Sequence, residues 1–285
     1  MPLPRMAGKT QVRKRGDDVN SAQTVYYDDE LNDDFAATHG KIKTKPVTEK
    51  YRYIHKSPLW HLWSFALYRF VATPVGYIYL KLRFGLRIKN RKAAWRVKGG
   101  FFLYGNHTQS IADAFIPTIA AFPKKTNIIV SEDAVSIPVV NRLVAMLGGI
   151  PLASTLHGKG KFIKAIKAKA AAGQVIALYP EAHIWPYYNG IRPFSEAAFA
   201  YPFRYGIPAI GFTVTYRQRK IMKKLPPLIT VTLSDPVYPE MCSDKKDMRD
   251  RIYGFMCDTI KKENSFAYIR YEKRMDGNND NNDSL

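Results

Sequence analysis

The chain has 285 residues, of which 44 are Lys or Arg and 24 are Asp or Glu, so its net charge is +20. This length fits one large or two small domains, and the two cysteines provide neither a disulfide framework nor a zinc-ligand spacing. The excess of basic residues predicts an anionic partner, either nucleic acid or a membrane surface. The sparse cysteine usage favours a reducing compartment.

Both ends of the chain are predicted to be disordered. Residues 1–57 combine a basic cluster with an acidic cluster at residues 28–34, and they contain few large aliphatic side chains. Such a composition buries too little apolar surface to offset the entropy lost on ordering. It also contains no apolar run typical of a signal peptide. Residues 271–285, which are rich in Asn and Asp, are expected to form a second disordered segment.

Residues 58–98 are predicted to dock on a membrane surface. Large apolar side chains recur every three or four residues, as on one face of a helix, and Pro74 is expected to kink or split this helix. The uncharged stretches on either side of Arg69 are too short to cross a bilayer. A basic run follows at residues 81–98, and this combination is typical of an interfacial helix on anionic lipid. A helix packed in the core is the alternative. The apolar positions are Trp60, Trp63, Leu67, Phe70, Pro74, Tyr77, Leu80 and Phe84.

Residues 99–270 alternate between strand-like and helix-like patterns. Short apolar runs bounded by Gly or Pro predict strands, and Ala- and Lys-rich stretches such as residues 159–172 predict helices. This alternation predicts an α/β domain with a central, mostly parallel sheet flanked by helices. We expect strands near 101–104, 127–131, 149–152, 174–179, 207–215 and 228–234, and helices near 113–121, 138–147, 159–172, 195–205 and 246–263.

A histidine and an aspartate follow the first of these strands. His107 comes shortly after the apolar run at residues 101–104, and Asp113 lies within reach of the same loop. The unperturbed pKa of histidine is near neutrality, and a carboxylate can fix its tautomer and stabilise its charged form. The pair is therefore a candidate general base, although a turn histidine with a helix-capping aspartate would look the same in isolation.

Further motifs follow in a fixed order. Asn106, His107 and Asp113 resemble an Asn-His-(four residues)-Asp motif, and Tyr179-Pro180-Glu181-Ala182 resembles a Phe-Pro-Glu-Gly motif placed after a strand. Arg192-Pro193-Phe194 and Ile207-Pro208-Ala209-Ile210 match two later segments. In this order and at these separations, residues 95–235 are similar to the glycerolipid acyltransferase family, which includes the lysophosphatidic acid acyltransferases.

The resemblance implies a reaction and a place for it. It implies transfer of a fatty acyl group from acyl-CoA or an acyl carrier protein to a hydroxyl of a lysophospholipid or related glycerolipid, in phospholipid biosynthesis and without a cofactor or metal. His107 would be the general base and Asp113 its orienting group. Asn106 would donate to the oxyanion, and Glu181 would lie in the acceptor site. The expected location is the cytoplasmic face of a membrane, with the protein peripheral or monotopic.

The sequence also departs from the family pattern. Five residues separate His107 from Asp113, where the motif has four. Ile184 and Ser154 stand at two positions where the family has arginines that are expected to hold the acceptor phosphate. A planar guanidinium suits that task, and Arg192 is the nearest substitute, so we expect it to bind the acceptor phosphate.

Two other classes of function remain open. A degenerate protein of the same fold could bind anionic lipid without turnover, and a hydrolase could use the same pair with water. Basic clusters at residues 159–169 and 217–224 are compatible with any anionic partner. Nucleic acid is not expected, because the sequence contains no helix-turn-helix, zinc-finger or RNP-like motif.

Overall fold

A seven-stranded sheet forms the centre of the computed structural model, which describes residues 23–35, 44–136 and 140–274. Five neighbouring strands, from β7 to β5, are parallel, whereas β8 is antiparallel to β7 and β2 is parallel to β8. The predicted α/β fold with a mostly parallel central sheet is therefore confirmed. In spatial order the strands are β2 (Arg87–Lys89), β8 (Leu228–Leu233), β7 (Ala209–Arg217), β3 (Phe101–Gly105), β6 (Val175–Leu178), β4 (Thr126–Val130) and β5 (Gly149–Pro151).

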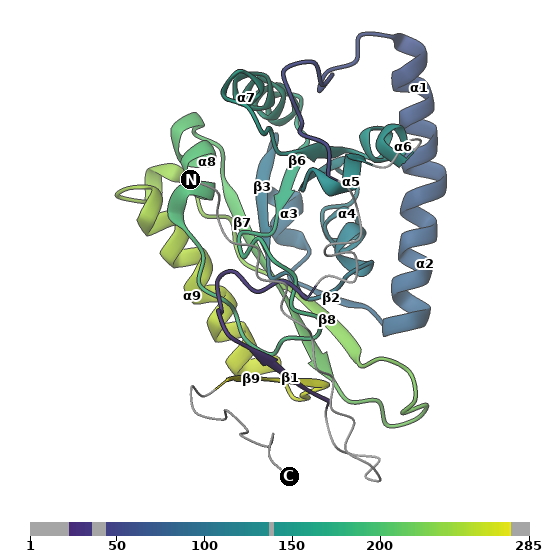
Figure 1. Ribbon diagram of the computed structural model, residues 1–285, viewed down its shortest axis with the longest axis vertical. Helices are drawn as coiled ribbons and strands as arrows, with labels where there is room; N and C mark the ends of the chain where they lie inside the picture. Colours follow the sequence, from purple (N-terminus) through teal and green to yellow (C-terminus); the bar gives the residue numbers. More distant parts are fainter. Residues whose placement is uncertain (1–22, 36–43, 137–139, 275–285) are drawn as a thin grey trace, which may run out of the picture.

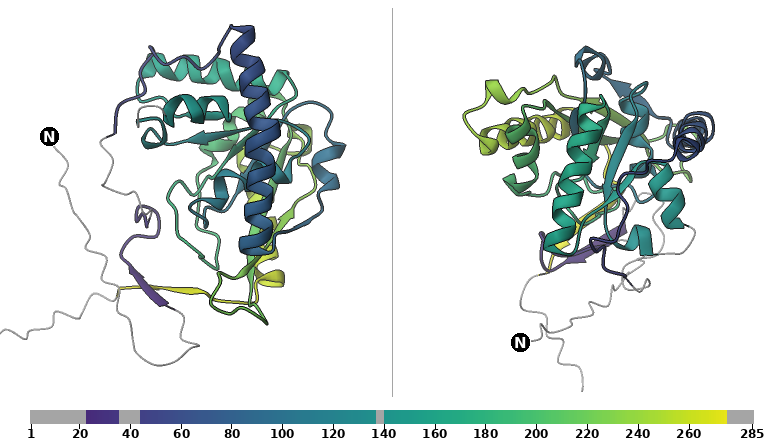
Figure 2. Two further views of the ribbon diagram at one scale, coloured as in Figure 1. Left: turned by 90° about the vertical axis from the view of Figure 1, so that its right-hand side faces the viewer. Right: turned by 90° about the horizontal axis from the view of Figure 1, so that it is seen from above.

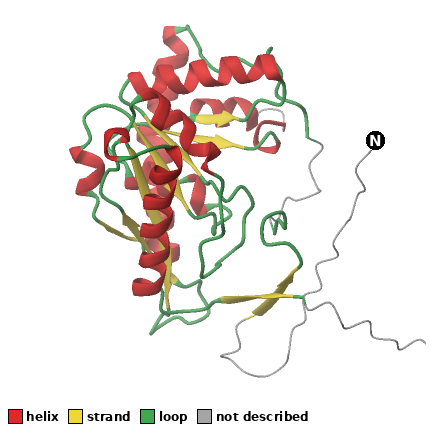
Figure 3. Cartoon of the chain, turned by 90° about the vertical axis from the view of Figure 1, so that its left-hand side faces the viewer, coloured by secondary structure: helices red, strands yellow, loops and turns green. Residues whose placement is uncertain are grey.

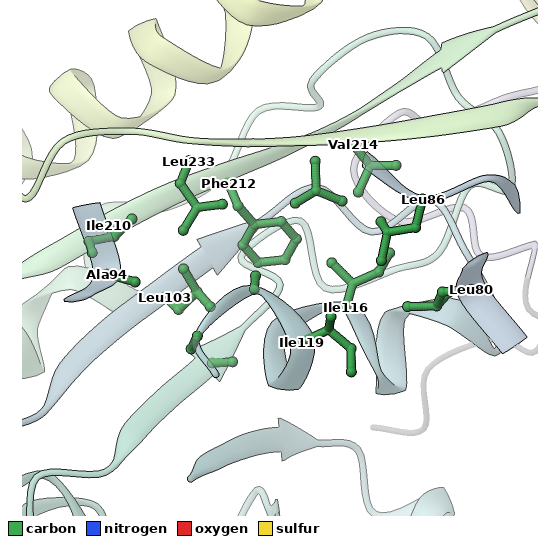
Figure 4. Packing of buried hydrophobic residues seen from close by; sticks show 14 of the residues in the cluster. Leu80, Leu86, Ala94, Leu103, Ile116, Ile119, Ile210, Phe212, Val214 and Leu233 are labelled. Carbon is green, nitrogen blue, oxygen red and sulfur yellow. The ribbon is translucent and has the colours of Figure 1, made fainter. Parts of the chain in front are cut away.

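Strand β3 lies in the middle of the sheet and is buried on both faces. Phe101 and Leu103 contribute to a core beneath α2, α3 and α4, which Figure 4 shows in part. Phe102 and Tyr104 contribute to a second core beneath α7, α8 and α9, and Figure 3 views the domain from the side on which α8 and α9 lie. A continuous apolar run is what a strand covered on both faces requires. These helices are α2 (Thr73–Phe84), α3 (Lys92–Arg96), α4 (Ile116–Ala120), α7 (Leu156–Ala171), α8 (Ala200–Tyr205) and α9 (Lys245–Glu263).

One long helix runs along the side of the domain (Figures 1 and 2). It consists of α1 (Pro58–Ala66), the π-helical segment η1 (Leu67–Ala72) and α2. Pro74 does not split it, because the N–H of Thr73 bonds to the carbonyl of Tyr68 in the wider π turn and Pro74 then falls in the first turn of α2. The predicted apolar face also differs in part, since Leu80 and Phe84 pack in the core.

The remaining elements complete the layers and the edge of the sheet. Within the predicted docking segment 58–98, residues 87–89 form β2, which joins the edge of the central sheet. The predicted helix at 138–147 corresponds to α6, the short helix α5 precedes it, and residues 137–139 lie outside the described residues. The bounds are η2 (Ala112–Ala114), α5 (Asp133–Ser136), α6 (Val140–Met146), η3 (Glu196–Phe199) and η4 (Pro239–Met241).

The two ends of the described chain pair with each other. Strand β1 (Gln23–Tyr27) is parallel to β9 (Ile269–Lys273), and both lie at the lower end of the molecule in Figure 1. The structure thus differs from the predicted disorder of residues 1–57 and 271–285 over residues 23–35, 44–57 and 271–273. The rest of those predictions lies outside the described residues.

Gly105, the last residue of β3, is expected to tolerate no side chain. A Cβ there would lie 1.9 Å from Cζ of Phe212 in the core, so Gly105→Ala should lower the free energy of unfolding by about 1–3 kcal/mol through overpacking. Urea denaturation measures this change. Gly160→Ala in α7 is the control, since no heavy atom lies within 4 Å of its Cβ position, and it should stabilise by up to ~1 kcal/mol. Equal effects of the two substitutions would contradict the packing seen at β3.

Candidate functional site

The predicted base and its carboxylate meet at the carboxyl edge of the sheet. His107 follows β3, and its Nδ1 lies 2.7 Å from Oδ2 of Asp113. The side chain of Asp113 is 3% exposed and that of His107 is 24% exposed. Burial raises the pKa of Asp113, and the hydrogen bond from His107 opposes this shift. When Nδ1–H donates to the carboxylate, Nε2 of the neutral imidazole carries the lone pair that can accept a proton.

A closed turn accommodates the additional residue between His107 and Asp113. The N–H of Asp113 donates to the carbonyl of Gln109 at 3.2 Å, and the N–H of Gln109 donates to Oδ2 of Asp113 at 2.9 Å. The 3-10 helix η2 then carries Asp113 at its centre. The longer spacing therefore does not separate the two side chains.

Two tyrosines to which the sequence analysis gave no role hold this loop. The ring of Tyr179 stacks on the imidazole of His107 with 4.5 Å between centroids, and its hydroxyl donates to the carbonyl of Asp113 at 2.6 Å. The hydroxyl of Tyr216, on β7, donates to Oγ1 of Thr108 at 2.7 Å. In the sequence, Tyr179 was marked as the first residue of the motif after a strand but not as a partner of His107, and no local signal marked Tyr216.

Glu181 connects the loop after β6 to the loop after β3. Its Oε2 accepts a hydrogen bond from the N–H of His107, and its Oε1 accepts one from the N–H of Arg192, both at 3.0 Å. Burial raises the pKa of Glu181 to about 7, although the Arg192 guanidinium and the two N–H donors favour the ionised form. Both oxygens thus face backbone donors, and this places the backbone of His107. The expected acceptor-site role of Glu181 stays a prediction.

Arg192 lies beneath this loop and not on an open surface. Its side chain is 1% exposed, and its Nη2 is 3.7 Å from Oε2 of Glu181. The guanidinium donates to the carbonyls of Glu181, His183 and Glu30, and it packs 5.0 Å from the ring centre of Trp185. This geometry differs from the expectation that Arg192 binds an acceptor phosphate, because a buried guanidinium that donates to backbone carbonyls does not face a substrate.

Asn106 extends the pairing between β3 and β7. Its Nδ2 donates to the carbonyl of Val214 at 3.2 Å, and its Oδ1 accepts from the N–H of Val214 at 2.8 Å. The side chain is fully buried. The structure therefore differs from the expected oxyanion donor, since the amide of Asn106 fixes the path of the chain immediately before His107.

Residues 28–35 cover the outer side of the loop after β6. The indole Nε1 of Trp185 donates to the carbonyl of Asp33 at 2.8 Å, and Trp185 is fully buried. Composition predicted disorder here because the aromatic partners of this segment are distant in sequence. The rings that contact Trp185 are those of Tyr27, Phe35, Tyr188 and Tyr271.

The two positions that lack the family arginines serve the packing of neighbouring segments. Oγ of Ser154 donates to Glu132 at 2.7 Å and accepts from the N–H of Val47 at 2.6 Å. Ile184 is buried, and its N–H donates to Oδ1 of Asp34 at 3.2 Å. Both departures from the family pattern are thus built into local contacts.

The arrangement suits proton transfer to or from a hydroxyl that a substrate supplies. Of the loop's own hydroxyls, Thr108 Oγ1 accepts from Tyr216, and Ser110 is exposed in the turn. A histidine oriented by a buried carboxylate can remove a proton from such a hydroxyl. In the described part of the chain, no group of three or more His, Cys, Asp or Glu side chains is placed to hold a metal ion.

The fold of this chain is similar to that of a known protein structure. The crystal structure of the 1-acyl-sn-glycerophosphate (LPA) acyltransferase PlsC from Thermotoga maritima aligns at 17% sequence identity and a TM-score of 0.49. The alignment covers 71% of this chain and 92% of that chain. No protein-family model matches the sequence, and no curated protein matches it.

The buried ion pair of Glu181 and Arg192 is expected to be essential for folding. Arg192→Ala would leave the carboxylate of Glu181 buried without its cation, so we expect a loss of about 3–5 kcal/mol in the free energy of unfolding. Arg192→Lys should restore only part of this, because an ammonium lacks the planar set of donors. Equilibrium denaturation checks both.

Arg251→Ala is the matched control, since Arg251 pairs with Asp247 at 2.9 Å on an exposed face. That substitution should change the free energy of unfolding little, because a solvent-exposed ion pair contributes little to stability. A similar cost for Arg192→Ala would show that the buried pair is not a structural requirement.

Proposed function

We propose that this protein is an acyltransferase that moves a fatty acyl group from an acyl thioester, acyl-CoA or acyl carrier protein, to a hydroxyl of a lysophospholipid or related glycerolipid. The observation that carries the proposal is the hydrogen bond of 2.7 Å between His107 and the buried Asp113, in a loop held by Glu181. The ordered motifs around Asn106 and Tyr179, which resemble the glycerolipid acyltransferase family, support the substrate class.

In the proposed reaction, the acceptor hydroxyl gives its proton to Nε2 of His107 as its oxygen attacks the thioester carbonyl carbon. Asp113 stabilises the imidazolium that forms. The tetrahedral intermediate then loses the thiolate as the carbon–sulfur bond breaks, and the imidazolium proton passes to that thiolate. Direct transfer needs no enzyme nucleophile, and the chain contains no Gly-x-Ser-x-Gly segment.

The outward face of the long helix supports a membrane partner. The buried positions of this helix include the small or polar residues Ser64, Thr73 and Gly76, whereas large apolar side chains are more than half exposed. An apolar surface of this extent marks a contact with a membrane or a protein. The basic run that follows favours anionic lipid. The exposed side chains are Leu59, Leu62, Trp63, Phe65, Phe70, Val71, Val75, Ile78 and Leu82.

The turn between β7 and β8 adds to this surface. Ile221 and Met222 are exposed at its tip, and Arg219 donates to the carbonyl of Arg83 near the end of α2 at 2.6 Å. Apolar side chains among lysines are suited to the interface of an anionic membrane. Within the described residues, no helix combines the length and apolar character needed to span a bilayer. We propose a peripheral or monotopic position on the cytoplasmic face of a membrane. The neighbouring lysines are Lys220, Lys223 and Lys224.

The alternative function is lipid binding by the same fold without turnover. The net charge of +20 and the outward apolar face are also compatible with lipid binding, but this alternative assigns no chemistry to His107. Hydrolysis is distinguished by its product, because water in place of the acceptor would release free fatty acid. Labelled acyl-CoA incubated with purified protein and mixed membrane lipids separates these cases by where the label appears.

His107→Ala is expected to lower the rate of acyl transfer about 10²–10⁴-fold, the usual contribution of a general base. Asp113→Asn should also reduce the rate, because an amide cannot stabilise the imidazolium. The assay follows label from acyl-CoA into lysophosphatidic acid and other lysophospholipids. His157→Ala, at an exposed position of α7, is the control and should leave the rate unchanged. Full activity of His107→Ala would contradict the mechanism, and no turnover by the wild type with any common donor would favour the lipid-binding alternative.

The combined variant Leu62→Ser, Phe70→Ser and Leu82→Ser is expected to lose sedimentation with anionic vesicles, since each side chain lies on the outward face. Wild-type binding should weaken at high salt, which screens the basic residues. Met241→Ser, an exposed apolar position in η4, should bind as the wild type does. Unchanged binding by the triple variant would remove the helix from the membrane contact.

A further inference from the structure

Two adjoining cavities lie at the amino edge of the sheet, opposite to the edge that carries His107. Lys125 directly precedes β4 and Gln174 directly precedes β6, and both line the inner cavity. The inner cavity has a volume of about 160 Å³ and the outer one about 420 Å³. They share residues from the segment before α1 and from its first turn. The shared residues are Arg52, His55 and Trp60.

The inner cavity is positively charged. Lys125 and Lys169 line it together with Arg52, and its lining contains no Asp or Glu among the described residues. The Nζ of Lys125 donates to Oγ of Ser64 at 3.1 Å and lies 5.4 Å from the ring centre of Tyr68. Two ammonium groups that lose water without a counter-charge destabilise their surroundings, and a bound anion would offset this cost.

The lowered pKa values of Lys169 and Lys125 are consistent with an anion-binding site. Burial lowers the pKa of Lys169 to about 8, with a smaller contribution from the neighbouring charge of Lys125. Burial also lowers the pKa of Lys125. An anion between the two ammonium groups would favour their charged forms and so raise both pKa values.

The outer cavity is apolar and opens onto the outward face of the long helix. Leu59, Trp63 and Met146 line it, and the side chains of Leu59 and Trp63 are more than half exposed. In Figure 1 the start of α1 lies at the upper end of the molecule, as α7 does, away from β1 and β9. A ligand that fits both cavities therefore carries an anionic group and an apolar chain, with the chain on the face that we propose contacts the membrane.

We propose that these cavities bind a lipid with a phosphate-monoester headgroup, which lies between Lys125 and Lys169 while an acyl chain lies along Leu59 and Trp63. This site is distinct from the dyad, because β6 separates Gln174 at one edge of the sheet from Glu181 at the other. The binding does not depend on the proposed reaction. A lipid at this site would hold the amino end of the long helix against the membrane.

Calorimetric titration of the full chain tests the proposal. The ligands are dihexanoyl phosphatidic acid below its critical micelle concentration, dihexanoyl phosphatidylcholine and inorganic phosphate. The variant is Lys125→Met with Lys169→Met, which keeps chain length and apolar volume. The control is Lys159→Met with Lys164→Met, which removes the same charge from exposed positions of α7. We expect the site variant to bind phosphatidic acid about tenfold or more weakly, and the control to bind it as the wild type does.

A second measurement uses the wild-type protein and does not depend on the variants folding. Acetic anhydride at pH 8 should modify Lys169 faster than the exposed lysines, because more of its amine is uncharged, and phosphatidic acid should protect it. Mass spectrometry of peptides reads out both effects. The variants serve only if their thermal unfolding matches that of the wild type.

Each of the following outcomes would contradict the proposed lipid site. Equal loss in the control variant would show binding to general surface charge. Inorganic phosphate bound as tightly as phosphatidic acid would identify a site for a soluble anion, and phosphatidylcholine bound as tightly would remove the role of headgroup charge. Absence of protection at Lys169 would remove the site. His107→Ala should retain this binding while losing acyl transfer, so failure of one proposal is distinguishable from failure of the other.

Discussion

The carboxylate of Glu181 is the contact on which the geometry of the candidate site depends. It accepts one N–H from the residue that carries the imidazole and one from Arg192, so it joins the chain that leaves β3 to the chain that leaves β6. A buried carboxylate is costly unless hydrogen bonds and a counter-charge offset it, and the Arg192 guanidinium supplies that charge. The guanidinium in turn donates to the carbonyl of Glu30, which ties residues 28–35 to the same loop. The position of His107 is therefore set by a network that reaches the first described residues of the chain.

The long helix has an unusual distribution of side chains. A surface helix of a water-soluble protein normally buries its apolar side and exposes its polar side. Here the buried positions include Ser64, Thr73 and Gly76, and Gly76 allows close approach to Phe115 on the sheet side, where an added Cβ would lie 2.3 Å from it. The exposed side carries Leu, Trp, Phe and Val. This pattern satisfies two different surroundings at once, the domain on one side and a proposed membrane on the other.

The two edges of the sheet differ in chemistry. At the carboxyl edge, the buried acids Asp113 and Glu181 order a loop around one imidazole. At the amino edge, Lys125 and Lys169 face a cavity in whose lining the described residues include no carboxylate. The long helix passes along the domain between these ends, so a membrane on its outward face would lie near both (Figure 2). A protein that acts on lipid at one edge and holds lipid at the other would keep its orientation on the membrane while acceptor and product exchange.

Local pattern in the sequence determined strands β3 to β8, most of the longer helices, the parallel sheet and the pair of His107 with Asp113. It could do so because apolar runs, Gly and Pro boundaries and short-range spacing act within a few residues. Tertiary structure alone decided the roles of Asn106 and Arg192, whose partners lie on β7, in the loop after β6 and in residues 28–35. It also decided that residues 23–35 are ordered, since Trp185 and β9 supply the contacts that their own composition lacks. The composition of a segment indicates how much apolar surface it can bury. The group against which it packs depends on contacts between segments that are distant in the sequence, and no local pattern contains these contacts.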